Sequence, residues 1–566
     1  MHKYVTLLLR GGLGIAALVL ANVAVAQEVT AAAQEAAAPD HSRFVGYPQQ
    51  DALHYSLQLQ LDPAKAELVG SCEYTFRSEV KDLAFIRLDL LPADDYSVSF
   101  STLDGQPLAS VLDDLGLKVM LPEAARQGQE IQFRANFKGK PADGIYWRNS
   151  RYGKPVVYTD HFSTRARGWL PCEDYPGDRA SFAIQIQTPG KANQIACSGM
   201  GEQQQITLED GAIAQQWTSQ TQSDISTYML ALAVGPYLRY EEEGDPRLEP
   251  HFVYAKDLAK ARRGLNKHAE WIKLMEGYFG PYAYGKYTTV QVPTRWGGME
   301  NPGLVWLMEG IFDGRDRGHG TLAHELVHMW FGDAVGYARW EDAWLSEGFA
   351  SYLGPWLTEQ AGNGTPIRNS MQGIRRRWLN TKAGRQRPIR WLQYKQPDDF
   401  FSSSSVNTYS KAAFVVHMLR AELGDELFFA GLGNYTRKHS GQAVVTADFQ
   451  RAMEEVMEQA AKESDGQKWP KDDVALDWFF SQWLDRPDCP HLVFEWSDSG
   501  VTVKQTQQSE PFRFGLTLKW TTVAGEERKQ RFDIRDRVTE IQLDGGPIKA
   551  PVIDPDVNLL YRRGKG

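Results

Sequence analysis

Two histidines and two glutamates near the middle of the chain have the types and spacing of a metal site. His324 and His328 are four residues apart, so on a helix both side chains project from one face, about one turn apart. Two imidazoles at this spacing can bind one zinc ion. Glu325 can reach a water on that ion, and Glu347, nineteen residues after His328, can add a carboxylate ligand. These four residues indicate a zinc hydrolase.

The same pattern also fits an amphipathic core helix with two hydrogen-bonded histidines, and the flanking residues help to weigh the two readings. Residues 321–331 contain no proline or glycine and carry apolar side chains that can face a core, after which Gly332 can end a helix. A second predicted helix, residues 342–352, carries Glu347 beside a stripe of apolar side chains. Both helices would hold the ligands on packed, rigid elements, which favours the metal site.

Length and composition are those of an ordinary globular protein with roughly two to four domains. Of the 566 residues, 42% are hydrophobic and 23% are charged. The formal net charge of -9 comes without a basic stripe, so nothing favours nucleic acid as a partner. The cysteines are too sparse to act as a scaffold, lack metal-ligand spacing, and could pair in three full ways if oxidised. They are Cys72, Cys172, Cys197 and Cys489.

The N-terminus has the features of a secretory signal peptide, which we expect to span residues 1–26. An apolar run over residues 11–25 follows a lysine near the start, and a small-x-small cleavage site ends at Ala26. Cleavage there would make Gln27 the first residue of a periplasmic or secreted protein; an uncleaved membrane anchor is the alternative. We expect no other membrane span, and we expect residues 27–44 to be a flexible leader.

Hydrophobic periodicity divides the rest into three regions of a multidomain α+β protein. Residues 45–240 alternate apolar and polar side chains and predict an all-β domain, residues 241–487 predict a mostly helical catalytic domain, and residues 488–566 predict a small β-sandwich. The expected strands are 55–62, 72–76, 84–90, 131–137, 181–187, 229–234, 492–495, 501–505, 514–520 and 530–534. Besides the two metal-site helices, the expected helices are 258–279, 410–423, 427–438 and 446–463.

The sequence Gly297-Gly298-Met299-Glu300-Asn301 bears on which bond is cut. Glycines let the backbone approach a substrate closely or lie as a sheet edge beside it. The Glu300 carboxylate near that backbone could bind a free α-ammonium group through charge-assisted hydrogen bonds. Gly-Gly pairs are also common in turns, so the sequence alone leaves both interpretations open.

Together these motifs resemble the zinc aminopeptidase family of aminopeptidase N and leukotriene A hydrolase. The resemblance rests on the His-Glu-x-x-His helix, on Gly-Gly-Met-Glu-Asn before it, and on residues 344–350 and 409–411 after it. It extends to a landmark of the family's first domain, matched by Arg167, Pro171, Cys172, Asp174 and Pro176. It covers nearly the whole mature chain and implies a β domain, a thermolysin-like catalytic domain and a β-sandwich. The family's C-terminal helical domain is not matched.

The resemblance also implies a role for each matched residue. One zinc ion per chain is held by His324, His328 and Glu347. Glu325 acts as general base and then as acid, and Tyr409 donates a hydrogen bond to the oxyanion of the tetrahedral intermediate. Glu300 holds the substrate's N-terminal amine within the segment Gly297–Asn301. The implied substrate is therefore a peptide with a free N-terminus, from which the first residue is removed.

The chain departs from the family pattern at several positions. Phe162 stands where relatives place a second amine anchor, so either Asp160 or His161 substitutes or amine binding rests mostly on Glu300. Trp296 directly precedes the glycine pair, where relatives line the pocket for the first side chain, and it favours small or flat first residues; a purely structural tryptophan is the alternative. Without a fourth domain, the cleft would be more open or covered by a partner.

Three other functions remain open at this point. A zinc endopeptidase or an epoxide hydrolase could use the same scaffold, and Asn301-Pro302 resembles the leukotriene hydrolase branch. A peptide-binding protein without catalysis is the non-enzyme alternative. The intact base Glu325 argues against it, because a binding module has no need of a base.

Overall fold

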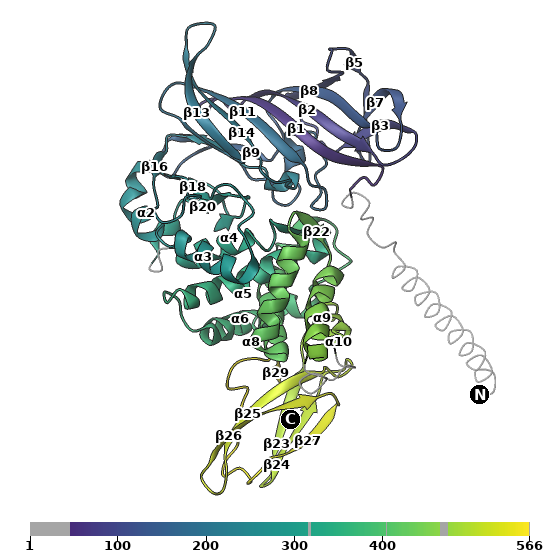
Figure 1. The fold of residues 1–566 in the computed structure, drawn as a ribbon, viewed down its shortest axis with the longest axis vertical. Helices are drawn as coiled ribbons and strands as arrows, with labels where there is room; N and C mark the ends of the chain where they lie inside the picture. The colour runs from purple at the N-terminus through teal and green to yellow at the C-terminus, as the bar shows by residue number, and fades with distance from the viewer. Residues whose placement is uncertain (1–45, 315–317, 403–404, 464–473, 565–566) are drawn as a thin grey trace, which may run out of the picture.

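The computed structural model describes residues 46–314, 318–402, 405–463 and 474–564. Three regions follow one another along its long axis: N-terminal sheets, a central region rich in helices, and a C-terminal β region (Figure 1). This arrangement confirms the expected multidomain α+β fold. The predicted signal peptide, residues 1–26, and the predicted leader, residues 27–44, lie outside the described residues. None of the helices in the described residues is both long and apolar enough to span a bilayer.

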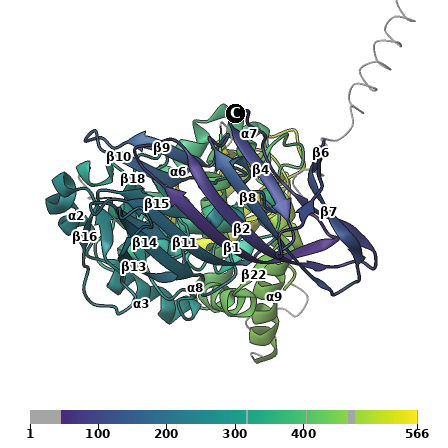
Figure 2. The same cartoon turned by 90° about the horizontal axis from the view of Figure 1, so that it is seen from above.

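The N-terminal region is built around an eight-stranded sheet in the order β13-β14-β11-β1-β2-β8-β4-β5. The long central strand β1 (Gln50–Leu61) pairs antiparallel with β2 (Leu68–Ser78) and parallel with β11 (Ser181–Pro189). Its side chains alternate between buried and more exposed positions, because one face of the sheet packs on the core. Figure 2 shows this sheet lying across the central region.

Two smaller sheets complete the N-terminal region, in the orders β12-β15-β10-β9 and β3-β7-β6. The remaining strands are β3 (Leu83–Leu88), β4 (Tyr96–Ser101), β5 (Pro107–Leu108), β6 (Ser110–Asp113), β7 (Gly116–Ala125), β8 (Glu130–Gly139), β9 (Ile145–Asn149), β10 (Pro155–Thr159), β12 (Gln194–Cys197), β13 (Met200–Thr207), β14 (Ile213–Gln220) and β15 (Leu232–Gly235). The strand expected at 229–234 starts later, because Thr227–Met229 forms a 3-10 turn.

The central region contains a five-stranded sheet in the order β16-β17-β18-β20-β19. The sequence predicted a mostly helical domain here and did not predict this sheet. Its strands are β16 (Leu238–Tyr240), β17 (His251–Val253), β18 (Thr288–Val292), β19 (Gly298–Met299) and β20 (Leu304–Met308). Strand β18 is buried along its whole length, so it lacks the alternation that marks a half-exposed strand. A two-stranded sheet joins β21 (Val335–Tyr337) to β22 (Gln442–Val444).

Most of the central region is helical. They are α2 (Leu258–Gly264), α3 (His268–Phe279), α4 (His319–His328), α5 (Trp344–Gln360), α6 (Ile367–Leu379), α7 (Lys382–Gln386), α8 (Ala412–His439), α9 (Thr446–Glu463) and α10 (Asp477–Leu484). The single helix predicted over 258–279 was wrong: it breaks after Gly264, where Leu265 leaves the helical conformation. The two helices predicted over 410–438 form one element with a kink at Gly424, whose φ is +77°.

The C-terminal region is a β-sandwich of two sheets, in the orders β27-β24-β23-β29 and β26-β25-β28. Its strands are β23 (His491–Trp496), β24 (Gly500–Gln505), β25 (Phe514–Thr521), β26 (Glu527–Ile534), β27 (Val538–Gln542), β28 (Val552–Ile553) and β29 (Arg562–Arg563). Alternating burial along β25 places its apolar side chains between the two sheets. All four cysteines are buried and unpaired.

Candidate active site

Helices α4 and α5 bring the three predicted zinc ligands together. His324 Nε2 lies 3.1 Å from His328 Nε2 and 3.2 Å from Glu347 Oε2, and His328 Nε2 lies 3.5 Å from Glu347 Oε2. Donors about 2.1 Å from a tetrahedral ion would stand about 3.4 Å apart, so these distances match the edges of a zinc coordination shell. The side chains of His328 and Glu347 are buried, whereas His324 is 22% exposed.

The hydrogen bonds of His328 leave its Nε2 lone pair free for a metal. Its Nδ1 lies 3.1 Å from the carbonyl oxygen of Phe331 and 2.9 Å from Ser346 Oγ. A carbonyl oxygen only accepts, so Nδ1 carries the proton and Nε2 does not. Such outer partners fix the tautomer and orientation of a ligating histidine. No local pattern points to Ser346, because its contact with His328 depends on how α5 packs on α4.

Glu325 lies against the edge strand that carries the glycine pair. A Cβ added to Gly298 would be 2.3 Å from Glu325 Oε1 and 2.5 Å from Glu325 Cδ, closer than atoms can pack. Gly298 itself pairs with Leu307 on β20, which fixes the position of β19. Glycine at 298 is therefore what allows the Glu325 carboxyl group to occupy this place, and both residues line the same cavity.

Three buried carboxyl groups meet beside the histidines. Donor atoms of Glu300, Glu325 and His328 all lie within 4.8 Å of one another, and Glu347 is the third carboxylate. Burial raises the pKa of Glu325 well above its usual range; His328 opposes this shift, while Glu300 and Glu347 add to it. Burial likewise raises the pKa of Glu300. These raised pKa values mean that ionised carboxylates are costly here unless a cation balances them. Together with the ligand distances, this makes the donor set fit one zinc ion.

The cavity that holds these groups has a volume of about 740 Å³. Tyr409 lines it from a π-helical turn, Asn407–Lys411, at the start of α8. The Tyr409 hydroxyl donates a hydrogen bond of 2.6 Å to Glu347 Oε1, the carboxylate oxygen that faces away from the histidines. The predicted oxyanion donor is therefore within hydrogen-bonding reach of the ligand set.

The segment after β10 brings Phe162 into the cavity. Thr159 accepts a hydrogen bond of 2.7 Å from Trp306 Nε1, which ties this segment to β20. Phe162 lines the cavity and packs against Phe401, with ring centroids 4.5 Å apart. Asp160 and His161 are buried and are not among the residues that line the cavity. Of the two options left open by the sequence, the geometry favours reliance on Glu300.

The other residues of the predicted substrate segment divide into two groups. Trp296, Gly297 and Met299 line the cavity beside Gly298 and Glu300, with the Arg295 guanidinium 4.4 Å above the Trp296 ring. Asn301 is buried and does not line it. Its backbone carbonyl accepts a hydrogen bond from Leu304, which makes it part of the turn from β19 to β20.

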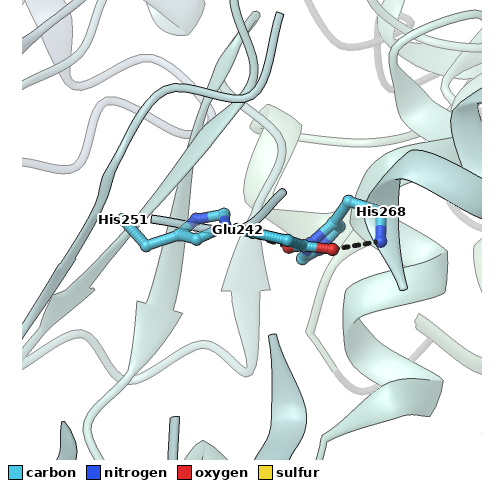
Figure 3. Close-up of side chains that lie close together, drawn as sticks. All are labelled: Glu242, His251 and His268. Carbon is cyan, nitrogen blue, oxygen red and sulfur yellow. Dashed lines mark hydrogen bonds and ion pairs between the residues drawn. The ribbon is translucent and has the colours of Figure 1, made fainter. Parts of the chain in front are cut away.

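A second buried group of one glutamate and two histidines lies elsewhere in the catalytic region (Figure 3). Glu242 Oε2 lies 2.6 Å from His268 Nδ1 and 3.1 Å from His251 Nε2, and Glu242 Oε1 accepts the backbone N–H of His268 at 2.8 Å. The backbone N–H of Thr289 donates to His251 Nδ1, so the His251 proton is on Nε2, aimed at Glu242. These are hydrogen bonds that cap α3, and they leave His251 no lone pair for a metal.

Comparison with known proteins places both main regions in one family. A model of the peptidase M1 N-terminal domain matches residues 51–229, and a model of the peptidase family M1 domain matches residues 263–483. An M1 zinc metallopeptidase from Deinococcus radiodurans, in a variant bound to a Tyr-Ser-Ala substrate, superposes with a TM-score of 0.64 at 25% identity. That match covers 80% of this chain and 98% of the other.

Curated relatives are longer than this chain. Glutamyl aminopeptidase of Bitis rhinoceros is 31% identical over 332 residues, covering 55% of this chain and 33% of the relative. Aminopeptidase B of Homo sapiens is 24% identical over 417 residues, covering 69% of this chain and 59% of that protein. The chain spans between a third and a half of the first relatives it matches. With two domain models of one family matched in order along it, the chain belongs to peptidase family M1.

Proposed function

We propose that the protein is a zinc-dependent aminopeptidase that removes the N-terminal residue from peptides. The proposal rests mainly on one observation: a carboxylate oxygen of Glu300, a carboxylate oxygen of Glu325 and a ring nitrogen of His328 all lie within 4.8 Å of one another. In an amino acid the amine nitrogen is about 2.5 Å from the carbonyl carbon. An ammonium group held by Glu300 therefore leaves only the first peptide bond beside Glu325 and the zinc ligands.

The residues of the site can each perform a defined step. When bound by His324, His328 and Glu347, zinc supplies the Lewis acidity that makes water a nucleophile near neutral pH. Glu325 takes the proton of the attacking water and passes it to the departing amine, serving as base and then as acid. Tyr409 turns its hydroxyl from Glu347 to the developing oxyanion and stabilises it.

A pair of peptides tests this function. The zinc-loaded protein should release only the first residue from a free-amine peptide and should leave the N-acetylated form intact, because acetylation removes the charge that Glu300 binds. Equal cleavage of both forms would instead support an endopeptidase. Failure to cleave either peptide, with zinc bound, would support a peptide-binding protein. Mass spectrometry of the products distinguishes these outcomes.

Trp296 supports a finer proposal about the first side chain. It lines the cavity directly before the glycine pair, so its ring would limit the volume available to that side chain or stack against it. We expect a preference for small or flat first residues. Comparing Ala-, Leu-, Arg- and Phe-anilides in wild type and Trp296→Ala tests this, and an unchanged ranking would refute it.

Export is also part of the proposal and rests on the sequence alone. The apolar run over residues 11–25 and the cleavage site ending at Ala26 support a periplasmic or secreted enzyme. The mass of the mature protein, expressed with its own N-terminus, should correspond to a chain that begins at Gln27. Recovery of the uncleaved chain in the membrane fraction would support an anchor instead.

A further inference from the structure

Helix α6 forms one wall of the catalytic cavity. Three of its residues line the cavity: Ser370, Ile374 and Arg377. They are four and three residues apart, the spacing that places side chains on one face of a helix. The helix therefore presents a continuous face to the space in front of the zinc ligands.

The rest of α6 is held by other parts of the protein. Arg375 Nη1 forms an ion pair of 2.6 Å with Asp554 Oδ2 in the C-terminal region, and Arg368 donates a hydrogen bond of 2.8 Å to the carbonyl oxygen of Pro555. Trp378 Nε1 donates a hydrogen bond of 2.8 Å to Oδ1 of Asn407, the first residue of the turn that carries Tyr409. These contacts fix the helix, so its cavity-facing side chains have a defined position relative to the site.

Arg377 is the single lysine or arginine among the described residues that line the cavity. Its exposed guanidinium group makes no hydrogen bond or ion pair with any described residue, whereas Arg375 on the same helix is paired. The carboxylates of Glu300, Glu325 and Glu347 line the same cavity. The cavity is therefore polarised, with a negative group of residues at the zinc site and an available positive charge on α6.

An arginine in the last turn of a helix also interacts favourably with the helix dipole, and this role needs no ligand. Arg376 occupies the same turn, carries the same charge and does not line the cavity. The helix dipole thus explains the presence of a positive charge equally well at both positions. The two arginines differ in that only Arg377 lines the cavity. This pair of neighbours provides a matched control.

We propose that Arg377 binds the C-terminal carboxylate of short peptide substrates, so that the cavity prefers peptides with both ends free. Guanidinium groups bind carboxylates through two parallel hydrogen bonds, and a cavity of about 740 Å³ is in the range that encloses a ligand of tripeptide size. The proposal rests on the proposed aminopeptidase activity, which orients the amine toward Glu300. It adds an anchor for the opposite end of the substrate.

The test compares peptides that differ only at the C-terminus. Leu-Ala-Ala and Leu-Ala-Ala-amide are cleaved by the zinc-loaded full chain, alongside a series from two to six residues in both forms. We expect wild type to have a KM roughly threefold to tenfold lower for the free acid at the best length, with little change in kcat, because the contact is remote from the reacting bond. The difference should disappear for the longest peptides.

Three variants assign the effect to one side chain. Arg377→Ala should bring the acid and amide forms to the same KM, and Arg377→Lys should restore part of the difference through its point charge. Arg376→Ala should keep the wild-type difference. If Arg377→Ala does not fold, Arg377→Gln replaces it, and the wild-type comparison stands without any variant.

The outcomes separate this proposal from the proposed function. Equal KM values for acid and amide at every length in wild type would overturn the role of Arg377 while leaving the aminopeptidase intact. A difference that persists in Arg377→Ala, or that vanishes in Arg376→Ala, would also overturn it. Failure to cleave any free-amine peptide would instead reject the aminopeptidase activity itself.

Discussion

Replacing Gly298 by alanine should displace the proposed catalytic base, Glu325, while leaving the glutamate itself in the sequence. The new Cβ would lie 2.3 Å from Glu325 Oε1, 2.5 Å from its Cδ and 2.7 Å from its Cγ. Ordinary contacts begin near 3.4 Å, so the carboxyl group must retreat by about 1 Å or the strand must move. Both responses separate the base from the water that it must deprotonate.

The magnitude follows from the role of the displaced group. A displacement of about 1 Å at a reacting centre can cost about 100-fold in rate, and general base catalysis contributes about 100- to 10,000-fold in all. We therefore expect kcat/KM of Gly298→Ala to fall about 100-fold. Zinc content should stay at one per chain, because His324, His328 and Glu347 lie on other elements.

The assay measures hydrolysis of an aminoacyl anilide by protein whose zinc content has been determined. Gly297→Ala is the matched control: its Cβ would come no closer than 3.8 Å to Thr321, so its loss should be far smaller. Glu325→Asp shortens the base by one methylene, so it should cost less in the Gly298→Ala background than in wild type. Activity of Gly298→Ala within threefold of wild type, with zinc bound, would refute this reasoning.

Three further variants test other parts of the site. Glu325→Gln should retain zinc but lose about 100- to 10,000-fold in turnover, and full activity would contradict the proposed base. Ser346→Ala should weaken zinc binding about 10- to 100-fold by loosening His328, measured by competition with a chelator; unchanged affinity would show that the Phe331 carbonyl suffices. Burial raises the pKa of Asp160 from 3.8 to about 6, so the folded protein holds this proton more tightly and loses stability as pH rises through about 6. Asp160→Asn should remove about 2 kcal/mol of that loss between pH 4.5 and 7.5, measured by urea unfolding; an unchanged pH dependence would contradict it.

Periodicity predicted the elements whose burial has a regular period. The predicted strand 501–505 corresponds to β24 (Gly500–Gln505), and the predicted helix 446–463 has the bounds of α9 (Thr446–Glu463). The sequence also predicted that the two histidine ligands on α4 lie close together, because residues four apart on a helix project from the same face. A local sequence pattern is enough to predict these features, because they depend on contacts between residues that are close in sequence.

The contacts that complete the site come from residues far apart in sequence. The sheet strand β18 (Thr288–Val292) is buried on both faces and has no period that separates it from a helix. The approach of Gly298 to Glu325 depends on packing between β19 and α4, and the place of Arg377 depends on how α6 is held by Asp554. No pattern within one segment carries that information.

Strand β19 is the last strand of its sheet, and its residues line the cavity. The edge strand of a sheet offers backbone donors and acceptors to any extended chain. An edge strand that lines a cavity can pair only with a single free strand that enters the cavity. If the protein has the proposed aminopeptidase activity, folded proteins whose first residues are already paired should be poor substrates. Trimming should therefore stop a residue or two before the structured part of a protein begins, so that the ladder of products seen by mass spectrometry would mark where a folded domain starts.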